Sequence, residues 1–340
     1  MVRILSTLVL SVVACLHLGT AHAQSCGDTV THDITLTADL HCTTGWFALY
    51  VPSHGVTIDL NGHTISGDRG LVGISINDAV SVRIVNGGIS GFWGGVVGLR
   101  AHKLTMQNMH LKDLDVGVSL NHSIGAQIVD NDFALMTGNA IGFAVPAGAG
   151  HGAAGSHYIA YNRIESSGRG IELCGYDNSD AVIVGNELHK IADYGIHATD
   201  GSGGHRIEDN LFTGIDNTGI VLRGSRDNEI RGNVIREGRL GIAFTPQFTG
   251  SCEAGPLAAP LVRDNRIESN SLLKLDGGVS LGLGVTTSPL VFKNRIQFNK
   301  IYDNTTGLYF REDAHGNDAT GNAFTGTVTP VVDDGVGNSY

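Results

Sequence analysis

The sequence predicts an all-β protein built as a β-helix of about ten or eleven coils. Three observations support this prediction. A phrase that combines an asparagine with a small residue recurs every 22 to 25 residues, with three longer intervals of 31 to 34 residues. The apolar runs are short and alternate with polar residues, and 48 of the 340 residues are glycine. This glycine content is about twice the usual ~7%, which suits a chain with many tight turns.

The composition fits a compact, acidic protein. Lys and Arg number 22 against 33 Asp and Glu, so the formal net charge is −11, and 41% of the residues are hydrophobic. This apolar content is sufficient for a core and argues against disorder, and the absence of a Gly-X-Y period argues against collagen. The acidic balance makes nucleic acid and anionic membrane surfaces poor partners.

The N-terminal residues 1–23 have the pattern of a signal peptide. A positively charged start precedes an apolar run at residues 4–18 and a small-x-small cleavage site, Ala-His-Ala, at residues 21–23. Lipid attachment at Cys15 is the alternative. The mature domain is therefore expected to span residues 24–340, where no apolar run reaches the ~18 residues of a membrane span. We expect a secreted or periplasmic protein.

One short phrase returns along almost the whole mature chain. It has an asparagine, any residue and an apolar residue, and then, eight or nine positions after the asparagine, a small residue followed by Ile, Val or Leu. The asparagines are Asn61, Asn86, Asn108, Asn131, Asn162, Asn186, Asn210, Asn233, Asn265, Asn299 and Asn322. The small-apolar pairs include Gly170-Ile171, Gly195-Ile196, Gly219-Ile220 and Gly241-Ile242. Two markers at a constant offset indicate structural repeats.

Each repeat is expected to form one coil of short strands. The apolar runs are three to five residues long, as in Ile220-Val221-Leu222, whereas helical repeats need longer runs with a 3.6-residue period. A period near 23 residues leaves room for about three strands and tight turns. The asparagines would then stack inside as a ladder at the ~4.8 Å strand spacing, and the glycines would supply turn angles. We therefore assign none of these repeated residues to chemistry.

The N-terminal part of the mature chain shows a family resemblance. The segments Cys26-Gly-Asp-Thr-Val, Leu36-Thr-Ala-Asp-Leu-His-Cys42 and Val56-Thr-Ile-Asp-Leu-Asn-Gly-His-Thr-Ile-Ser-Gly67, with the repeats that follow, resemble exported pectin-lyase-like proteins with right-handed parallel β-helix repeats. The resemblance implies a single-stranded right-handed parallel β-helix with an N-terminal cap, and a polysaccharide lying along a groove on parallel strands. Neither a paired-aspartate arrangement with a Gly-His-Gly, as in polygalacturonases, nor the Asp-Pro-His-Asp of alginate epimerases is found, so the resemblance implies the scaffold and not the reaction.

Alternation along the strand after the second marker locates candidate catalytic residues. Isoleucines such as Ile171 and Ile196 are expected to point inward, so the residues that follow them point outward. Glu172 and His197 then lie on adjacent coils of one outward face, with Arg223 one coil further. A carboxylate, an imidazole and a guanidinium can bind a sugar acid and move its proton. The alternative is a row of surface salt bridges.

Long loops after the same strand are expected to form the walls of a cleft. They cover residues 146–157, 175–180 and 245–260, and insertions in solenoids gather on the binding face. Tyr176 is a candidate catalytic base. The candidate substrate-binding residues are Arg223, His151, His157, Asp177 and Asp200.

Four cysteines remain after residue 23, and an even set in an exported chain suggests disulfides. A Cys26–Cys42 bridge would close the N-terminal cap, and a Cys174–Cys252 bridge would tie two loops across the coils. Four cysteines allow three pairings, and free thiols at Cys174 and Cys252 are the alternative.

Calcium is the candidate cofactor, although the sequence makes no cofactor certain. Asp177, Asp180 and Asp200 are loop carboxylates, and a cation between an acidic protein and a polyuronate would be favourable. The alternative is ordinary solvated aspartate in turns.

Three functions from different classes remain open. The leading one is an exported enzyme that cleaves an acidic, uronate-containing polysaccharide by β-elimination, with His197 or Tyr176 as the base and Arg223 or calcium neutralising the carboxylate. The second is a glycoside hydrolase that uses Glu172 with Asp177 or Asp200. The third is a noncatalytic cell-surface or carbohydrate-binding β-helix. The sequence does not fix the sugar, the linkage or the oligomeric state.

Overall fold

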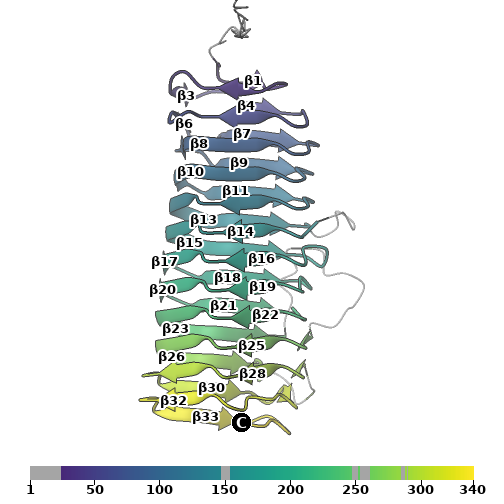
Figure 1. Cartoon of the computed structure of the whole chain (residues 1–340), viewed down its shortest axis with the longest axis vertical. Coiled ribbons are helices and arrows are strands. Elements are labelled where there is room, and N and C mark those ends of the chain that lie inside the picture. The colour runs from purple at the N-terminus through teal and green to yellow at the C-terminus, as the bar shows by residue number, and fades with distance from the viewer. Residues whose placement is uncertain (1–23, 147–153, 247–251, 253–260, 285–287, 289) are drawn as a thin grey trace, which may run out of the picture.

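Parallel β-strands form a solenoid of about twelve turns in the computed structural model (Figure 1). The structure describes residues 24–146, 154–246, 252, 261–284, 288 and 290–340. The predicted β-helix is confirmed, with slightly more turns than the ten or eleven expected, because the strands up to Val51 come before the first repeat asparagine, Asn61. The predicted signal peptide, residues 1–23, lies outside the described residues.

The strands form three stacks, in which each strand pairs in parallel with its counterpart one coil away. The first stack contains β1 (Asp28–Thr29), β4 (Phe47–Val51), β7 (Val72–Asn77), β9 (Gly94–Leu99), β11 (Val116–Asn121), β18 (Tyr194–Thr199), β21 (Thr218–Arg223), β30 (Thr306–Phe310) and β33 (Thr329–Asp333). The second contains β3 (Leu40–Cys42), β6 (Thr64–Gly67), β17 (Glu187–Ile191), β20 (Leu211–Ile215), β29 (Lys300–Tyr302) and β32 (Ala323–Thr325).

The third stack completes the coil. It contains β2 (Ile34–Thr35), β5 (Thr57–Asp59), β12 (Gln127–Val129), β14 (Tyr158–Ala160), β16 (Val182–Val184), β19 (Arg206–Glu208), β22 (Glu229–Arg231), β25 (Arg266–Glu268) and β28 (Arg295–Gln297). Long strands turn a corner and join two stacks: β8 (Arg83–Ser90), β10 (Thr105–Leu114), β13 (Asp132–Ala144), β15 (Arg163–Cys174), β23 (Val234–Thr245) and β26 (Ser271–Leu281). A small separate sheet contains β24 (Val262–Arg263), β27 (Val291–Phe292) and β31 (Ala314–His315).

The core is a column of aliphatic and aromatic side chains inside the coils. Ile171, Ile196, Ile220 and Ile242 follow one another in register and are fully buried, as the alternation predicted. Burying one such side chain stabilises the fold by about 1.5 to 3 kcal/mol, so the repeated apolar positions hold the column together.

The predicted asparagine ladder is confirmed from Asn131 onward. In each rung, the Oδ1 atom accepts hydrogen bonds from the backbone N–H and from the Nδ2 of the asparagine one coil earlier. Asn186, for example, donates both to Asn210 Oδ1 at 2.9 Å. The rungs are Asn131, Asn162, Asn186, Asn210, Asn233, Asn270, Asn299 and Asn322.

Four of the asparagines assigned to this ladder lie elsewhere. Asn265 belongs to a second ladder at another corner, and Asn270, five residues later, takes its expected place. The second ladder is Asn228, Asn265, Asn294, Asn317 and Asn338. The first three repeat asparagines, Asn61, Asn86 and Asn108, are exposed and have positive φ angles, which asparagine tolerates better than most residues.

The sequence suggested that glycines supply turn angles. The glycines of the second marker are instead required by close packing between coils. A Cβ atom on Gly195 would lie 2.5 Å from the carbonyl oxygen of Gly219, one coil away, and 2.7 Å from the ring of Phe212. Gly195 does not have a positive φ angle. Neighbouring coils therefore approach too closely at this corner for any side chain.

Two buried histidines occupy the corner of the second asparagine ladder in earlier coils. His157 Nδ1 accepts the backbone N–H of Ala126, and His205 Nδ1 accepts that of Ala181, each at 3.2 Å. Burial lowers the pKa of His157 to about 4 and that of His205 to about 3. Both side chains are therefore neutral in the folded protein at neutral pH and substitute for asparagine as acceptors.

Both expected disulfides are present. Cys26 is bonded to Cys42, and Cys174 to Cys252. The first closes the N-terminal cap, and the second joins β15 to the segment after β23. Among the described residues, no helix is long and apolar enough to cross a membrane.

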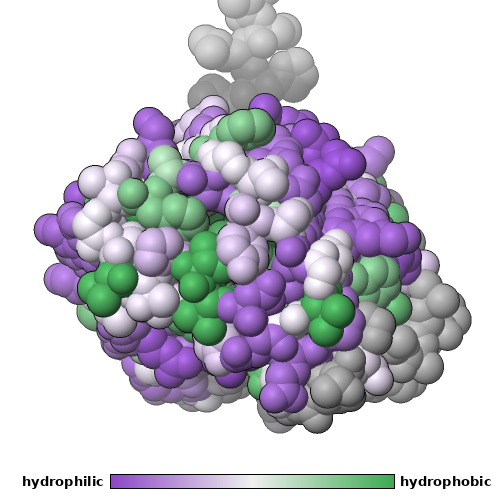
Figure 2. Space-filling view, turned by 90° about the horizontal axis from the view of Figure 1, so that it is seen from below, coloured by the Kyte–Doolittle hydropathy of each residue, from purple (hydrophilic) through white to green (hydrophobic). Residues whose placement is uncertain are grey.

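The C-terminal end of the column is less well covered than its middle. Figure 2 shows this end, where apolar side chains lie between polar ones. Phe324 and Val331 pack against the core but are only partly buried, and Val328 is 79% exposed. These residues belong to the last coil that the structure describes.

Replacing Asn210 by Leu tests the first ladder. Asn210 Oδ1 accepts two hydrogen bonds from Asn186, and its Nδ2 donates to Asn233 and to backbone oxygens. The change leaves these buried groups without partners, and we expect a loss of about 1 to 3 kcal/mol in the free energy of unfolding. Denaturant unfolding measures it, with Asn121→Leu on an outward position as the control. Equal stability of the two variants would contradict a stabilising ladder.

Replacing His205 by Asn tests the buried histidines. Because the folded-state pKa values of His157 and His205 lie below the ordinary value of 6.5, the unfolded chain binds more protons as the pH falls below about 6.5. Their contribution to stability is complete above that pH and decreases toward pH 4, by up to about 1.4 kcal/mol per pH unit for each histidine. In His205→Asn we expect a shallower decrease, measured by urea unfolding from pH 7 to 4.5, whereas exposed His32→Asn should keep the wild-type slope.

Candidate active site

The candidate site lies on the outward face of β15, β18 and β21 in the first stack. Glu172 on β15 is directly beside His197 on β18, and Thr199 on β18 is beside Arg223 on β21. This is the register that the sequence predicted. It brings Glu172 and His197 into contact and places Arg223 one coil toward the C-terminus.

Three groups hold the carboxylate of Glu172, which is 17% exposed. His197 Nδ1 lies 3.2 Å and Arg169 Nη1 3.3 Å from Oε1, while Asn139 donates to Oε2. Burial alone would raise the pKa of Glu172, but His197, Arg169 and Asn139 together hold it below its usual value. Glu172 is therefore ionised at neutral pH and acts only as a hydrogen-bond acceptor.

His197 is oriented by this carboxylate. Because an ionised Glu172 can only accept, the proton of the neutral imidazole is on Nδ1, and Nε2 keeps its lone pair. Nε2 is buried without a hydrogen-bond partner among the described residues. Although His197 is on the outward face, it is only 2% exposed, in part because the Tyr194 ring lies against it with a centroid distance of 4.8 Å. In this arrangement Nε2 of His197 can accept a proton, and the Tyr194 ring covers the imidazole.

A second line of polar contacts holds Arg169 in place. Its Nε donates to Asp193 at 3.0 Å, and Asp193 accepts another bond from Asn217 at 2.9 Å. These contacts connect three successive coils. They fix the guanidinium that supports Glu172.

Arg223 lies beside Tyr194 and lines a cavity. Its Nη2 donates to the Tyr194 hydroxyl at 3.1 Å, and its guanidinium lies 5.7 Å from the centre of the ring. The cavity has a volume of about 320 Å³, and Arg239 and Arg311 line it as well. Three guanidinium groups from different coils therefore converge on one cavity next to the Glu172–His197 pair.

These three arginines differ from most others in the protein. Arg69, Arg100, Arg169, Arg206 and Arg231, for example, form salt bridges with carboxylates. Within the described part of the chain, none of the three groove arginines, Arg223, Arg239 and Arg311, forms one. A carboxylate on a ligand is the natural partner of such a group, because a guanidinium binds it through two parallel hydrogen bonds.

Tyr176 and Asp177 line a different cavity. Its volume is about 370 Å³, and Asp180 and Arg226 line it too. The Arg226 guanidinium lies 5.9 Å from the centre of the Tyr176 ring. None of these residues lines the cavity of Arg223, so the loop residues and the strand residues do not form one site.

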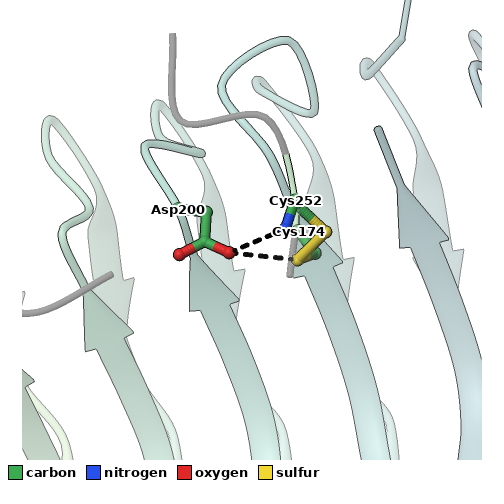
Figure 3. Close-up of side chains that lie close together, drawn as sticks. All are labelled: Cys174, Asp200 and Cys252. Atoms are coloured by element: carbon green, nitrogen blue, oxygen red, sulfur yellow. Dashed lines mark hydrogen bonds between the residues drawn. A yellow bond between two sulfur atoms is a disulfide. The ribbon is translucent and has the colours of Figure 1, made fainter. Parts of the chain in front are cut away.

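Asp200 is buried beside the second disulfide (Figure 3). Its Oδ2 accepts the backbone N–H of Cys252 at 3.1 Å and lies 3.6 Å from the Cys174 sulfur. The carboxylate is 0% exposed. Asp200 holds the Cys252 backbone and lines neither the cavity of Arg223 nor the cavity of Tyr176.

Of the two remaining histidine candidates, the structure describes only His157, which does not line the groove. His157 is 1% exposed, stacks on Phe143 with a centroid distance of 3.8 Å, and contacts Asn178 through Nε2. Its ring lies inside the coil corner and lines neither cavity, and its contact with substrate stays a prediction of the sequence. His151 lies outside the described residues.

The carboxylates expected to hold calcium do not come together. Among the described residues, Cys174, Asp200 and Cys252 form the single group of three potential ligands within reach of one another, and its sulfurs are bonded in the disulfide. Asp177 and Asp180 line the cavity of Tyr176, whereas Asp200 is buried. The structure thus offers no common calcium site for these three residues.

Sequence reasoning missed Tyr194 and Arg239. Tyr194 stands two residues before Ile196, so strict alternation would place it inward with Ile196, and the sequence did not indicate it. Arg239 lies in β23 between the paired residues Gly238 and Leu240 and lines the groove from a corner that no periodicity indicates.

Comparisons with known proteins agree with this fold. The model of the right-handed β-helix region matches residues 147–235 and 176–329. A periplasmic alginate epimerase, AlgG, is 15% identical with a TM-score of 0.62 over 78% of this chain and 68% of its own. A PL6 alginate lyase in complex with a trisaccharide is also 15% identical, with a TM-score of 0.66 over 93% and 79%.

A third solved structure has another activity on the same scaffold. The GH136 lacto-N-biosidase from Eubacterium ramulus is 12% identical, with a TM-score of 0.57 over 92% of this chain and 62% of its own. A search of curated protein sequences found no match. At these identities the likeness is one of fold.

Proposed function

The chain belongs to the right-handed β-helix family, and we propose that it is an exported enzyme that cleaves a uronate-containing polysaccharide by β-elimination. One observation supports this above all: an oriented Glu172–His197 pair adjoins a cavity lined by three arginines without carboxylate partners. The two alginate-active proteins of similar fold are consistent with it. Export accords with the two disulfides and with the signal-like residues 1–23.

In the proposed mechanism, Arg223 binds the carboxylate of the reacting uronate. Neutralising that charge makes the hydrogen on the adjacent C5 carbon more acidic. His197 removes this proton through Nε2 once the Tyr194 ring that covers the imidazole has moved aside, and Glu172 holds the imidazole and stabilises the cation that forms. The electron pair forms a C4–C5 double bond as the C4–O bond breaks.

The leaving oxygen needs a proton, and Tyr194 is placed to supply it. Its hydroxyl oxygen accepts a hydrogen bond from Arg223, so its own O–H remains available. The reaction leaves a protonated His197 and an ionised Tyr194, which exchange protons with water before the next turnover. In this scheme His197 and not Tyr176 is the base, and Tyr194 is the acid.

A hydrolase mechanism is less well supported by the geometry. Hydrolysis requires two carboxyl groups, one of them protonated as a general acid with a raised pKa. The pKa of Glu172 is lowered, Asp200 is buried beside the disulfide, and Asp177 lines another cavity. Calcium is not part of the proposed mechanism and stays a prediction of the sequence.

Incubation with a panel of polysaccharides tests the proposed function. Elimination from a uronan gives an unsaturated product that absorbs in the ultraviolet, whereas hydrolysis gives reducing ends without that absorbance. New reducing ends without absorbance would favour the hydrolase. Neither signal with any polymer of the panel would favour a noncatalytic, carbohydrate-binding β-helix.

Replacing Glu172 by Gln tests the orientation of His197. The amide of glutamine can donate to Nδ1, which moves the imidazole proton to Nε2 and removes the base. We expect kcat to fall by about 10²-fold or more with little change in KM, and His197→Ala to lose activity similarly. Glu187→Gln, an exposed carboxylate on the second stack, is the matched control. Full activity of Glu172→Gln would place the chemistry elsewhere.

Replacing Arg223 by Ala tests the carboxylate contact. We expect kcat/KM to decrease by about 10²-fold, because the substrate carboxylate loses its charged partner in binding and in the transition state. Arg223→Lys keeps the charge but loses the paired hydrogen bonds, so its loss should be smaller. Arg226→Ala changes the cavity of Tyr176 instead. If Arg226→Ala inactivates the enzyme and Arg223→Ala does not, the active site is in that second cavity.

A further inference from the structure

The cavity beside Arg223 continues into a second one along the column. The first cavity, of about 320 Å³, and the second, of about 300 Å³, share Arg239, Leu240, Ser280 and Arg311. The strands below them, β21, β23, β26 and β30, are successive members of the first stack. Three coil steps cover about 14 Å, so the two cavities form one groove that runs parallel to the column axis.

The second cavity has its own aromatic and charged lining. Tyr309 lines it, and the Arg311 guanidinium lies 4.5 Å from the centre of the Tyr309 ring. The Tyr309 hydroxyl donates to Asp334 at 3.0 Å, which holds the ring in place. A fixed aromatic ring next to a guanidinium offers a surface for a sugar ring and a partner for its carboxylate.

The positive charge of the groove is on one side of the reacting pair. Arg239 and Arg311 lie toward the C-terminal coils from Glu172 and His197. Toward the N-terminal coils, the outward positions in register with Glu172 are Gly142 and Ser119, which carry no charge. A polymer with several carboxylates is therefore held more strongly on the C-terminal side.

We propose that the second cavity is a further uronate subsite, so that the enzyme recognises a run of at least two consecutive uronates extending from the reacting sugar toward β30. This inference rests on the proposed function for the identity of the first subsite. Arg239 and Arg311 line both cavities and contact the carboxylates of neighbouring sugars. Tyr309 packs against the second sugar, so oligosaccharides of at least two uronates bind more tightly than a single uronic acid.

The test measures binding without turnover. Titration calorimetry at fixed ionic strength compares a single uronic acid with oligouronates of two to four residues on the His197→Ala protein, or on Glu172→Gln if the former does not fold. Carboxyl-reduced oligosaccharides of the same lengths are the ligand controls. We expect affinity to rise by about tenfold or more once the second cavity is filled, and carboxyl-reduced chains to bind at least tenfold more weakly.

Variants of residues that line the groove then show which side chains provide the higher affinity for longer oligouronates. Tyr309→Ala should remove the extra affinity of longer chains and leave that of the single uronic acid unchanged, and Arg311→Ala should weaken longer chains by about tenfold or more. Arg295→Ala, an exposed arginine on the third stack without a carboxylate partner among the described residues, should have no effect. An affinity gain that survives in both groove variants, or equal binding of carboxyl-reduced chains, would overturn the second subsite.

Turnover separates this inference from the proposed function. If oligouronates bind with the expected pattern but wild-type protein gives no unsaturated product, the subsite stands and the lyase activity is wrong. If unsaturated product forms but affinity does not change with chain length, the lyase activity stands and the subsite is wrong.

Discussion

Register between coils is the constraint on which the rest of this structure depends. Each coil must place its strands one hydrogen-bond spacing from the next, and a slip of one residue would turn every inward side chain outward. The asparagine ladder opposes such a slip, because Asn186, Asn210 and Asn233 bond to one another only when the coils are aligned. The same alignment makes outward side chains lie in rows, so a site can be built from residues about 25 positions apart. Glu172 and His197 are such a pair.

The site combines two ways of bringing groups together. Register alone sets Glu172 beside His197. Their side chains are short, so they can meet only from neighbouring strands. The arginines meet differently, because Arg223, Arg239 and Arg311 come from separate coils and converge through long side chains. The first arrangement is rigid and suits an oriented base, supported by Arg169. The second leaves guanidinium groups accessible, which suits binding of an extended polymer.

The repeats allowed prediction of the fold, the strand register and the contact between Glu172 and His197, because all three follow from the period. The place of Asn270 could have been predicted, because the second marker, Gly278-Val279, stands eight positions after Asn270, whereas no small-apolar pair follows Asn265 at that offset. Burial of His157 and Asp200 depends on turns between strands, which vary in length and carry no repeat. Arg239 was missed because it lies at a corner of β23, between the paired residues Gly238 and Leu240, where the alternation does not show which way a side chain points.

The charge of the groove is opposite to that of the whole chain, and this difference limits how a polyanion can bind. A protein with a formal net charge of −11 repels an anionic polymer at long range, and salt at 0.1 M screens this repulsion beyond about 10 Å. Attraction must therefore arise at short range, from arginines that form no salt bridge within the described part of the chain, although Asp276 also lines the second cavity. Tyr194 and Tyr309 lie against two of these arginines and exclude water on one side, which strengthens the local field. Affinity for uronates thus depends on contact within the groove and not on the charge of the molecule as a whole.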